Sequence, residues 1–286
     1  MSELVQRSLP GSGGAILRCC HTALDPAKPS LLIVLPFGVP ASLARAAFDA
    51  LGAACNVVTW ESRYILNLDL PFTGKEPLAP AAHVEDMRCI LAALEIGTCH
   101  LLGYCAGAGI ALLAASQHPE HFTDVILVNG EYQLFKRGYK PTAYQRSFDA
   151  FLPTVAADRR QASFVFARST EIARASKAGE PSELDRQIKL PYSHEEYLFR
   201  YARTYMAYRN FDALAVARDV RQPAFVLTSR QDVHASAEHS EAIRDAIPQV
   251  RDFIDDKGDH YEFCRAGSVT LDQIGAYLAT SGPHQP

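Results

Sequence analysis

The sequence contains little that would mark a secreted or metal-binding chain. Its 286 residues include seven cysteines, an odd and scattered set, so a disulfide framework is not expected in a chain long enough to bury its own core. No Cys-x-x-Cys pair and no Cys/His spacing typical of zinc ligands occurs. We therefore expect free cysteines and no bound metal.

Targeting and membrane-spanning segments are also missing from the sequence. The start, Met1-Ser2-Glu3-Leu4, has no basic region followed by an apolar one, so no signal peptide is visible. The uncharged run at 105–116 is too short to cross a bilayer and contains two glycines. These absences predict a soluble, cytoplasmic protein with no membrane partner.

The charge of the chain is small and unevenly distributed. There are 28 lysines and arginines against 32 aspartates and glutamates, a net charge of −4, which gives no overall basic footprint for a nucleic-acid partner. Residues 131–210, however, contain 14 basic against 9 acidic side chains, and 14 of the 27 aromatic residues. This segment is therefore basic and aromatic, whereas the rest of the chain is acidic.

Outside that segment, short apolar runs alternate with helical patterns. The run at 31–35, Leu-Leu-Ile-Val-Leu, is typical of a strand buried on both faces. Alternation of this kind predicts an α/β fold with a mostly parallel sheet covered by helices on both sides. Further strands are predicted at 56–60, 99–102, 124–128, 224–228 and 250–254, and helices at 41–51, 83–96, from 108 to about 117, 235–247 and 269–278.

Residues 131–210 interrupt the alternation. They contain no apolar strand pattern, but they carry many aromatic residues at helical spacing. An insertion of this kind between a strand and the next βα unit is expected to form a helical lid over the carboxyl edge of the sheet. The predicted organisation is a core of residues 1–130 and 211–286 with a lid of residues 131–210. The two ends, residues 1–8 and 281–286, are expected to be loose.

The most informative motif is Gly103-Tyr104-Cys105-Ala106-Gly107. It matches the nucleophile elbow Gly-x-Ser-x-Gly with cysteine in place of serine, and it lies between a predicted strand and a predicted helix, as the motif requires. The turn also places Cys105 at a helix N-terminus, where the dipole favours a thiolate over a thiol. Cys105 is therefore the candidate nucleophile. The alternative is a buried structural cysteine beside a glycine-rich turn.

A nucleophilic cysteine needs a base, and the base needs an orienting acid. In proteins with this elbow the acid follows a later strand and the histidine follows the last one. Asp232 lies four residues beyond the predicted strand at 224–228, and His260 follows the last predicted strand. His234 is the competing histidine. The alternative acids are Glu131 and Asp259, because the acid can also follow an earlier strand.

The oxyanion of a tetrahedral intermediate is expected to be held by backbone amides. One donor should be Ala106, which follows the nucleophile. The other should come from Phe37-Gly38-Val39, the loop after the first inner strand, and Val39 is favoured.

With this motif and this chain order of candidate residues, the chain resembles members of the α/β-hydrolase superfamily. The run Gly103-Tyr104-Cys105-Ala106-Gly107-Ala108-Gly109, with Asp232 and His260, is similar to its cysteine-nucleophile members. Among these, the chain most resembles the thioesterase-like aminoacyltransferases of nonribosomal peptide pathways, of the coronamic acid and syringomycin type. The resemblance implies catalytic roles for Cys105, His260 and Asp232 in moving an aminoacyl group between donor and acceptor carrier-protein (thiolation) domains. It implies no bound cofactor, since the phosphopantetheine arms of the carriers are substrates.

A cysteine nucleophile suits such a transfer. Moving an acyl group from a pantetheine thiol to serine would give an oxoester, a downhill step that is hard to reverse onto another thiol. Cysteine keeps a thioester at every stage, so the exchange stays near balance. Water must then be kept from the thioester, which is a role for the lid.

Further residues are candidates for binding. A basic lid predicts electrostatic steering of an acidic carrier protein, and a solvated helical face is the alternative. The densest basic cluster consists of Lys136, Arg137 and Lys140. Glu61 and Glu131 are candidate partners for the ammonium of an aminoacyl group, and Tyr104 is a further substrate-binding candidate.

Other functions remain open at this point. One is a hydrolase, either a proofreading type II thioesterase or an enzyme similar to dienelactone hydrolase, although the latter is expected to be shorter and to lack the lid. A polyester synthase, with a cysteine elbow on a longer chain, is another. The alternative of a different class is a non-catalytic scaffold that binds a partner.

Overall fold

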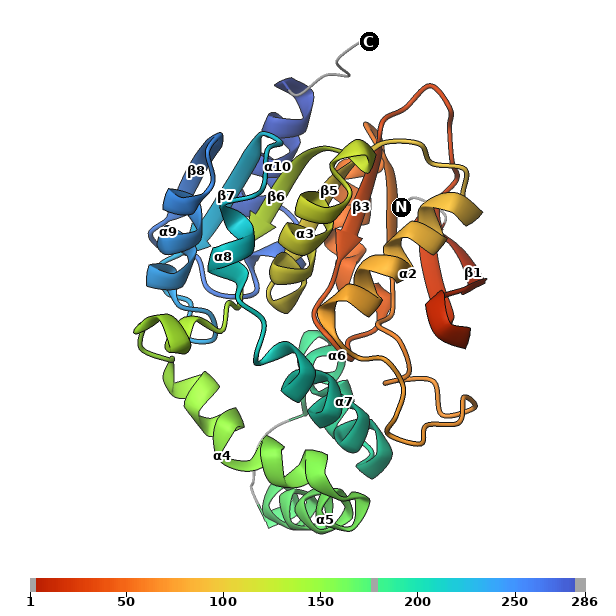
Figure 1. Cartoon of the computed structure of the whole chain (residues 1–286), viewed down its shortest axis with the longest axis vertical. Helices are drawn as coiled ribbons and strands as arrows, with labels where there is room; N and C mark the ends of the chain where they lie inside the picture. The colour runs from red at the N-terminus through yellow and green to blue at the C-terminus, as the bar shows by residue number, and fades with distance from the viewer. Residues whose placement is uncertain (1–3, 176–179, 281–286) are drawn as a thin grey trace.

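An eight-stranded sheet runs through the part of the chain that the computed structural model describes, residues 4–175 and 180–280 (Figure 1). The strand order is β1-β2-β4-β3-β5-β6-β7-β8. β1 pairs antiparallel with β2, and β2 pairs antiparallel with β4, whereas all the other pairs are parallel. The strands are β1 (Leu4–Pro10), β2 (Ile16–Thr22), β3 (Ser30–Val34), β4 (Asn56–Trp60), β5 (Cys99–Tyr104), β6 (Phe122–Val128), β7 (Ala224–Ser229) and β8 (Val250–Asp255).

The inner parallel strands are the apolar runs of the sequence. Every residue of β4, β5 and β7 is buried, and the register places Leu32 of β3 between Val58 of β4 and Leu101 of β5. Successive side chains point to opposite faces, so Leu32 joins one core layer and Ile33 the other. The six strands expected from the sequence are confirmed, with small shifts of their ends.

Helices cover both faces of the sheet (Figure 1). On one face, α2 and α3 bury Met87 and Ile110, and on the other, α1 and α10 bury Phe48 and Ile274. The α/β fold expected from the sequence is therefore confirmed. The core helices are α1 (Arg45–Leu51), preceded by the 3-10 helix η2 (Ala41–Ala44), α2 (Pro80–Ala93), α3 (Ala106–Gln117), α8 (Ala213–Ala217), α9 (Ala237–Ala246) and α10 (Val269–Thr280).

The N-terminal segment differs from the expectation. Residues 4–8 are not loose, because they belong to β1, which pairs along its whole length with β2. Most side chains of β1 are exposed, so its order comes from backbone pairing and leaves no apolar pattern in the sequence. Residues 281–286 lie outside the described residues.

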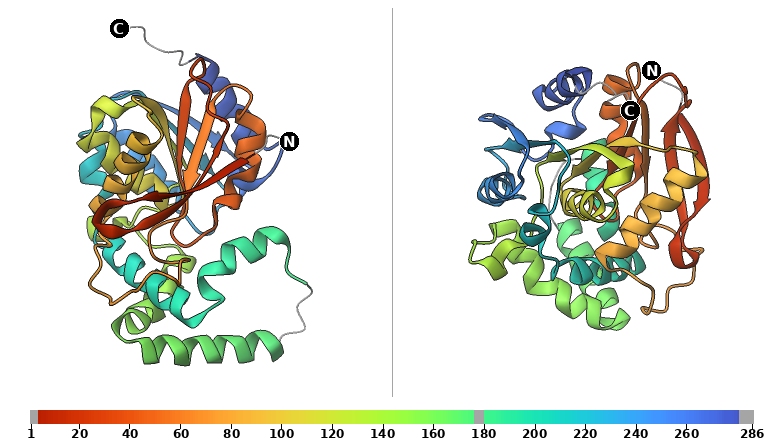
Figure 2. Two further views of the ribbon diagram at one scale, coloured as in Figure 1. Left: turned by 90° about the vertical axis from the view of Figure 1, so that its right-hand side faces the viewer. Right: turned by 45° about the horizontal axis from the view of Figure 1, so that its top comes forward.

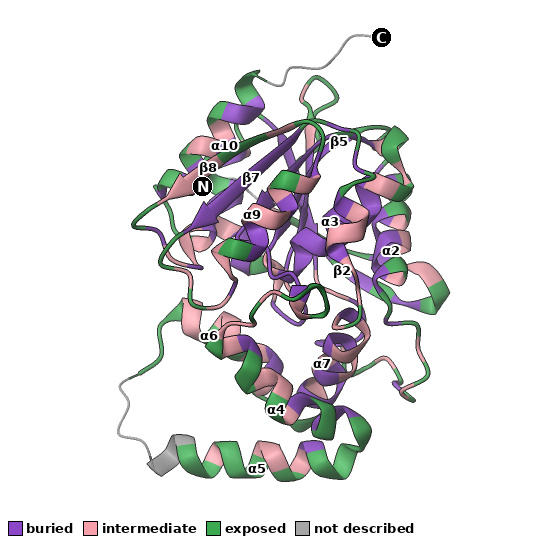
Figure 3. Cartoon of the chain, turned by 60° about the vertical axis from the view of Figure 1, so that its left-hand side comes forward, coloured by how far each residue is buried: buried purple, intermediate pink, exposed green. Residues whose placement is uncertain are grey.

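The segment between β6 and α8 consists of helices. Figure 2 shows them stacked beyond one edge of the sheet, and no strand occurs among the described residues of this segment. Figure 3 shows that α5 is largely exposed, whereas α7 is buried against the rest of the protein. The helices are η4 (Leu134–Arg137), α4 (Ala143–Ala157), α5 (Arg159–Ala175), α6 (Glu183–Lys189), η5 (Leu190–Tyr192) and α7 (Glu195–Tyr208).

Arginine side chains attach this lid to one loop of the core. Arg200 of α7 is 4% exposed. Its guanidinium donates to the carbonyl oxygens of Tyr64, Asn67 and Leu70 at 2.8, 2.8 and 3.1 Å. Arg159 and Arg203 donate to carbonyl oxygens further along the same loop. Part of the basic excess of the lid therefore holds the lid to the core, because a planar guanidinium can serve several acceptors at once.

Candidate active site

Cys105 lies in the turn between β5 and α3, at the carboxyl edge of the sheet. Its backbone has φ 54° and ψ −126°, a conformation that residues with a side chain rarely adopt. A Cβ on Gly103 would lie 2.5 Å from Cα of Ala108, and a Cβ on Gly107 would overlap the carbonyl oxygen of Val34. The two glycines of the motif are therefore required by the backbone, and the turn has the geometry of a nucleophile elbow.

Asp232 and His260 meet beside this turn. His260 Nδ1 and Asp232 Oδ2 are 2.7 Å apart, and both side chains are almost fully buried. The other carboxylate oxygen of Asp232 accepts the N–H groups of His234 and Ala235, each at 2.8 Å. The carboxylate is therefore fixed from two sides, and His260 is left with Nε2 as the nitrogen for proton exchange.

The competing candidates occupy other positions. Asp259 pairs with the exposed guanidinium of Arg265 at 2.7 Å. Glu131 faces Cys105, with Oε2 4.0 Å from Sγ. The ring of His234 packs 4.9 Å from that of His260, and its Nε2 lies 3.2 Å from the Tyr261 hydroxyl. Among the alternatives weighed from the sequence, none takes the place of Asp232 or His260.

Two side chains that the sequence does not single out for this task hold the loop of His260. Asn129, directly after β6, donates to the carbonyl oxygens of Asp259 and His260 at 3.2 Å each and to Ser229 Oγ at 3.1 Å. The Tyr104 hydroxyl donates to the His260 carbonyl oxygen at 3.0 Å. A polar residue at the carboxyl end of a buried strand was the available signal for Asn129.

The oxyanion loop corrects one expectation. The Gly38 N–H already donates to Ser62 Oγ at 2.8 Å, so Gly38 is not an oxyanion donor. Phe37 and Val39 line the cavity that contains Cys105, and so does Ala106 at the first position of α3. The candidate donors are therefore the amides of Ala106 and of Val39 or Phe37.

Burial is the largest influence on the pKa of Cys105. It raises the pKa of the Cys105 thiol well above its ordinary value, and the nearby carboxyl of Glu131 acts in the same direction. The Ala106 N–H lowers that pKa, but an amide at a helix N-terminus contributes about 0.3–1 kcal/mol, less than one pKa unit. Burial and Glu131 outweigh the Ala106 amide, so they favour the thiol over the resting thiolate expected from the sequence.

The cavity above Cys105 is small and walled by aromatic rings. Its volume is about 60 Å³. Most of the residues that line its lid side are tyrosines, whose rings pack on one another, for example Tyr192 edge to face on Tyr201 with centroids 5.2 Å apart. The tyrosines contributed by the lid are Tyr144, Tyr192, Tyr201, Tyr205 and Tyr208. The helices of residues 131–210 thus place aromatic rings around the cavity that contains Cys105.

This geometry agrees with comparisons to known proteins. A sequence profile for the alpha/beta hydrolase fold matches residues 47–264. The chain belongs to the α/β-hydrolase fold family. A hydrolase from Pseudomonas aeruginosa is 20% identical, with a TM-score of 0.70 and coverage of 97% of this chain and 98% of that one. An esterase from Exiguobacterium antarcticum is 16% identical, with a TM-score of 0.72 and coverage of 96% and 99%. At these identities the two structures show the fold alone.

This α/β-hydrolase also resembles a transferase along most of its length. An L-allo-isoleucyltransferase from Pseudomonas savastanoi pv. glycinea is 23% identical over 253 residues, which cover 87% of this chain and 86% of the relative. This likeness agrees with the resemblance to aminoacyltransferases noted from the sequence.

Two predicted substrate-binding residues of the α/β-hydrolase lie elsewhere or are already engaged. Glu61 lines a separate hollow of about 600 Å³ and pairs with Arg18 at 3.0 Å. It therefore does not reach the cavity of Cys105. The hydroxyl of Tyr104 is used by His260, so only its ring, which lines the cavity, is left for a substrate.

The basic cluster is exposed but partly paired. Arg137 forms a salt bridge with Asp212, and Lys136 Nζ donates to Asn210 Oδ1 at 2.6 Å. Lys140 is exposed as well. Within this cluster, Lys136 and Lys140 are the cations that form no salt bridge with the described residues.

Three residues of the candidate site could offer ligands to a metal ion. Asp232, His234 and His260 offer donor atoms within 4.8 Å of one another, a set that could in principle hold a metal ion. The oxygens of Asp232 are, however, already hydrogen-bonded to His260 and to two backbone amides.

In residues 4–175 and 180–280, no helix has the length and apolarity needed to cross a membrane.

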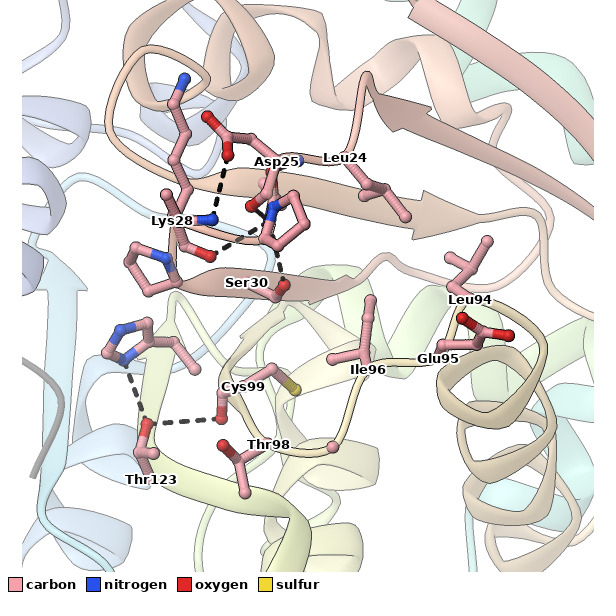
Figure 4. Close-up of a pocket in the computed structure, with 16 residues that line it drawn as sticks. Leu24, Asp25, Lys28, Ser30, Leu94, Glu95, Ile96, Thr98, Cys99 and Thr123 are labelled. Atoms are coloured by element: carbon pink, nitrogen blue, oxygen red, sulfur yellow. Dashed lines mark hydrogen bonds between the residues drawn. The ribbon is translucent and has the colours of Figure 1, made fainter. Parts of the chain in front are cut away.

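A larger hollow lies at the opposite edge of the sheet, where the parallel strands begin (Figure 4). Its volume is about 740 Å³, and Leu24, Lys28, Ile96 and Thr123 are among its lining residues. Cys99 belongs to it, but burial raises the pKa of that thiol and its side chain is buried in β5. Ligands of open parallel sheets bind at the carboxyl edge, so we place the candidate active site at Cys105.

Proposed function

We propose that this protein of the α/β-hydrolase fold is an aminoacyltransferase. It would move an aminoacyl group between the phosphopantetheine thiols of two carrier proteins, through a thioester on Cys105. The observation that carries the proposal is a cysteine at a nucleophile elbow, beside the His260–Asp232 pair and beneath a lid of tyrosines. The L-allo-isoleucyltransferase relative supports the kind of reaction.

The proposed first step transfers the acyl group to the enzyme. Cys105 Sγ attacks the donor thioester carbonyl while its proton moves to His260 Nε2, and the amides of Ala106 and Val39 hold the oxyanion. The bond from the acyl carbon to the pantetheine sulfur then breaks, and His260 returns the proton to the leaving thiolate. The acceptor thiol reverses this sequence. One thioester is exchanged for another, with no net gain of protons or electrons.

The arrangement around His260 and Asp232 supports this order of reaction steps. Asp232 Oδ2 accepts the Nδ1 proton of His260, which leaves Nε2 as the acceptor for the thiol proton. Because the Cys105 pKa is raised, a base at this position is required in the acylation step. The small, aromatic cavity limits water, which would otherwise hydrolyse the thioester.

A transfer assay tests the proposal. The protein is incubated with a labelled aminoacyl carrier protein and an unloaded second carrier, and the label is followed by intact mass. We expect label on Cys105 and then on the acceptor, with Cys105→Ala abolishing both. The matched control is Cys89→Ala in α2, outside the cavity, which should transfer at the rate of the unmodified protein.

The other outcomes identify the alternative functions. Release of free amino acid without acceptor labelling would make the protein a thioesterase, because the same residues hydrolyse a thioester that water can reach. Absence of any covalent label from a panel of loaded carriers would favour a scaffold that binds a partner. Persistence of label in Cys105→Ala would contradict the nucleophile assignment.

A further inference from the structure

The carboxyl of Glu131 is buried next to the nucleophile and lacks a cationic partner. Its residue is 8% exposed, Oε1 accepts a hydrogen bond from Gln133 Nε2 at 2.8 Å, and Oε2 faces Cys105 Sγ at 4.0 Å. It forms no salt bridge with any described residue. Buried carboxylates are normally paired, as Asp86 is with Arg63 at 2.5 Å in the core.

At this position the carboxyl of Glu131 makes ionisation of Cys105 less favourable. Burial raises the pKa of Glu131 to about 8, and Asp232 adds to the shift. The carboxyl in turn raises the pKa of the Cys105 thiol and so opposes its ionisation. It does not orient His260, because Asp232 does so. Glu131 therefore assists neither the ionisation of Cys105 nor the orientation of His260. A buried carboxyl in such a position becomes a stable carboxylate when a positive charge binds beside it, and the substrate can supply that charge.

We propose that Glu131 binds the α-ammonium of the acyl group and thereby restricts the enzyme to unblocked α-aminoacyl thioesters. The inference rests on the proposed function, since the ammonium belongs to the group carried on Cys105. In that thioester the α-nitrogen is separated from Sγ by two carbon atoms, so it lies roughly 3–4 Å from the sulfur. A carboxylate oxygen 4.0 Å from Sγ is therefore within reach of a charge-assisted hydrogen bond to the α-nitrogen.

The tyrosines of the lid complete a site for a cation. Glu131 lines the same cavity as five lid tyrosines, namely Tyr144, Tyr192, Tyr201, Tyr205 and Tyr208. Aromatic faces attract an ammonium group when it is shielded from water. A carboxylate with several aromatic rings around it selects a small cation over a neutral group.

The site also defines what is rejected. A des-amino acyl group would offer Glu131 no cation, so the charge-assisted hydrogen bond that favours the aminoacyl form would be missing. An N-acylated or peptidyl group would lack the charge, and its extra atoms would have to fit against Tyr205 and Tyr208 in a cavity of about 60 Å³. The substrate class is therefore a single amino acid with a free α-ammonium.

The test compares matched thioesters. A panel of aminoacyl-pantetheine thioesters first identifies one that acylates Cys105, and its des-amino and N-acetyl counterparts are then compared with it by intact mass. We expect at least about 100-fold faster acylation by the aminoacyl form. Glu131→Gln should reduce this preference to below about tenfold, and Glu131→Asp, which keeps the charge, should retain more of it.

The control variant is Glu61→Gln, a half-buried carboxyl in the separate hollow, which should keep the preference of the unmodified protein. Equal acylation by the aminoacyl and des-amino forms, or an unchanged preference in Glu131→Gln, would overturn the inference and leave the transferase proposal standing. If no member of the panel acylates Cys105, the proposed function fails, and the inference fails with it.

Discussion

The side chains of Asp232 and His260 are joined through Oδ2 and Nδ1 at 2.7 Å, and 3% and 6% of their surfaces are exposed. In Asp232→Asn, the amide can present a donor to Nδ1, so that the proton moves to Nε2 and the ring cannot accept the thiol proton. We expect acylation of Cys105 to slow by about 10³–10⁴-fold with little change in KM, as found for other buried His–Asp pairs. Rapid-quench measurement of Cys105 labelling checks this.

Asp259 offers the matched control for that prediction. It neighbours His260 in sequence, but its carboxylate is paired with exposed Arg265. Asp259→Asn should change the acylation rate by less than about threefold, because surface ion pairs contribute little. Equal losses in the two variants would assign the effect to the fold of the loop and not to the tautomer of His260.

The glycines of the elbow should be intolerant of substitution. A Cβ on Gly107 would overlap the Val34 carbonyl oxygen of β3, a backbone atom that cannot move without shifting the sheet. Gly107→Ala is expected to destabilise the protein by at least about 3 kcal/mol. Gly97→Ala, where nothing lies within 4 Å of the added atom, should change the free energy of unfolding by less than about 0.5 kcal/mol. Urea unfolding of both variants measures the difference, and similar midpoints would contradict the prediction.

The sequence was sufficient for the residues whose positions follow from chain order. Cys105, Asp232 and His260 each follow a strand of a parallel sheet, and the carboxyl ends of such strands share one edge, so their proximity could be predicted. The α/β architecture followed from apolar runs in the same way. These parts of the structure depend on local patterns and on topology.

Other features depend on contacts between distant segments. The Gly38 N–H is not free to bind an oxyanion because it donates to Ser62 Oγ, and Glu61 is held away from the cavity by its salt bridge with Arg18 of β2. β1 is ordered by pairing and has few buried side chains. Burial and the carboxyl of Glu131 raise the pKa of Cys105, and neither effect is visible in the local sequence around the helix N-terminus. None of these contacts has a periodic or local signal.

Glu131 should make the stability of the protein depend on pH. Because its pKa is raised from 4.5 to about 8 in the folded state, the fold retains a proton that the unfolded chain loses at lower pH. The contribution of Glu131 to the free energy of unfolding therefore falls as pH rises from about 4.5 to about 8. Glu131→Gln has no such titration, so its stability relative to the unmodified protein should increase across this window by a few kcal/mol, at about 1.4 kcal/mol per pKa unit.

Denaturant unfolding at pH 5 and pH 8 tests this prediction. The exposed Glu171 provides the control, and Glu171→Gln should give the same stability difference from the unmodified protein at both values. A Glu131→Gln variant whose relative stability does not rise between pH 5 and pH 8 would show that the carboxyl is already ionised in the fold.

The exposed lysines of the lid should affect encounter with carrier proteins. Lys136→Glu combined with Lys140→Glu should lower kcat/KM for an aminoacyl carrier about tenfold at low salt, with the difference shrinking as salt screens the charges. The same variant should react normally with a small pantetheine thioester. Lys28→Glu, at the opposite edge of the sheet in Figure 4, is the control. Equal effects on the carrier and the small thioester would exclude steering by these lysines.

Arg200 links the attachment of the lid to the fate of the thioester. Its guanidinium donates to three carbonyl oxygens of one core loop and pairs with Glu196 at 2.8 Å. Lysine keeps the charge but cannot serve these acceptors together, so Arg200→Lys should cost about 2–4 kcal/mol of stability. It should also admit water to Cys105 and raise the ratio of hydrolysis to transfer several-fold, whereas the exposed Arg168→Lys should change neither. If Arg200→Lys lost stability but kept the ratio, exclusion of water would have to come from the tyrosine walls of the cavity and not from the attachment of the lid.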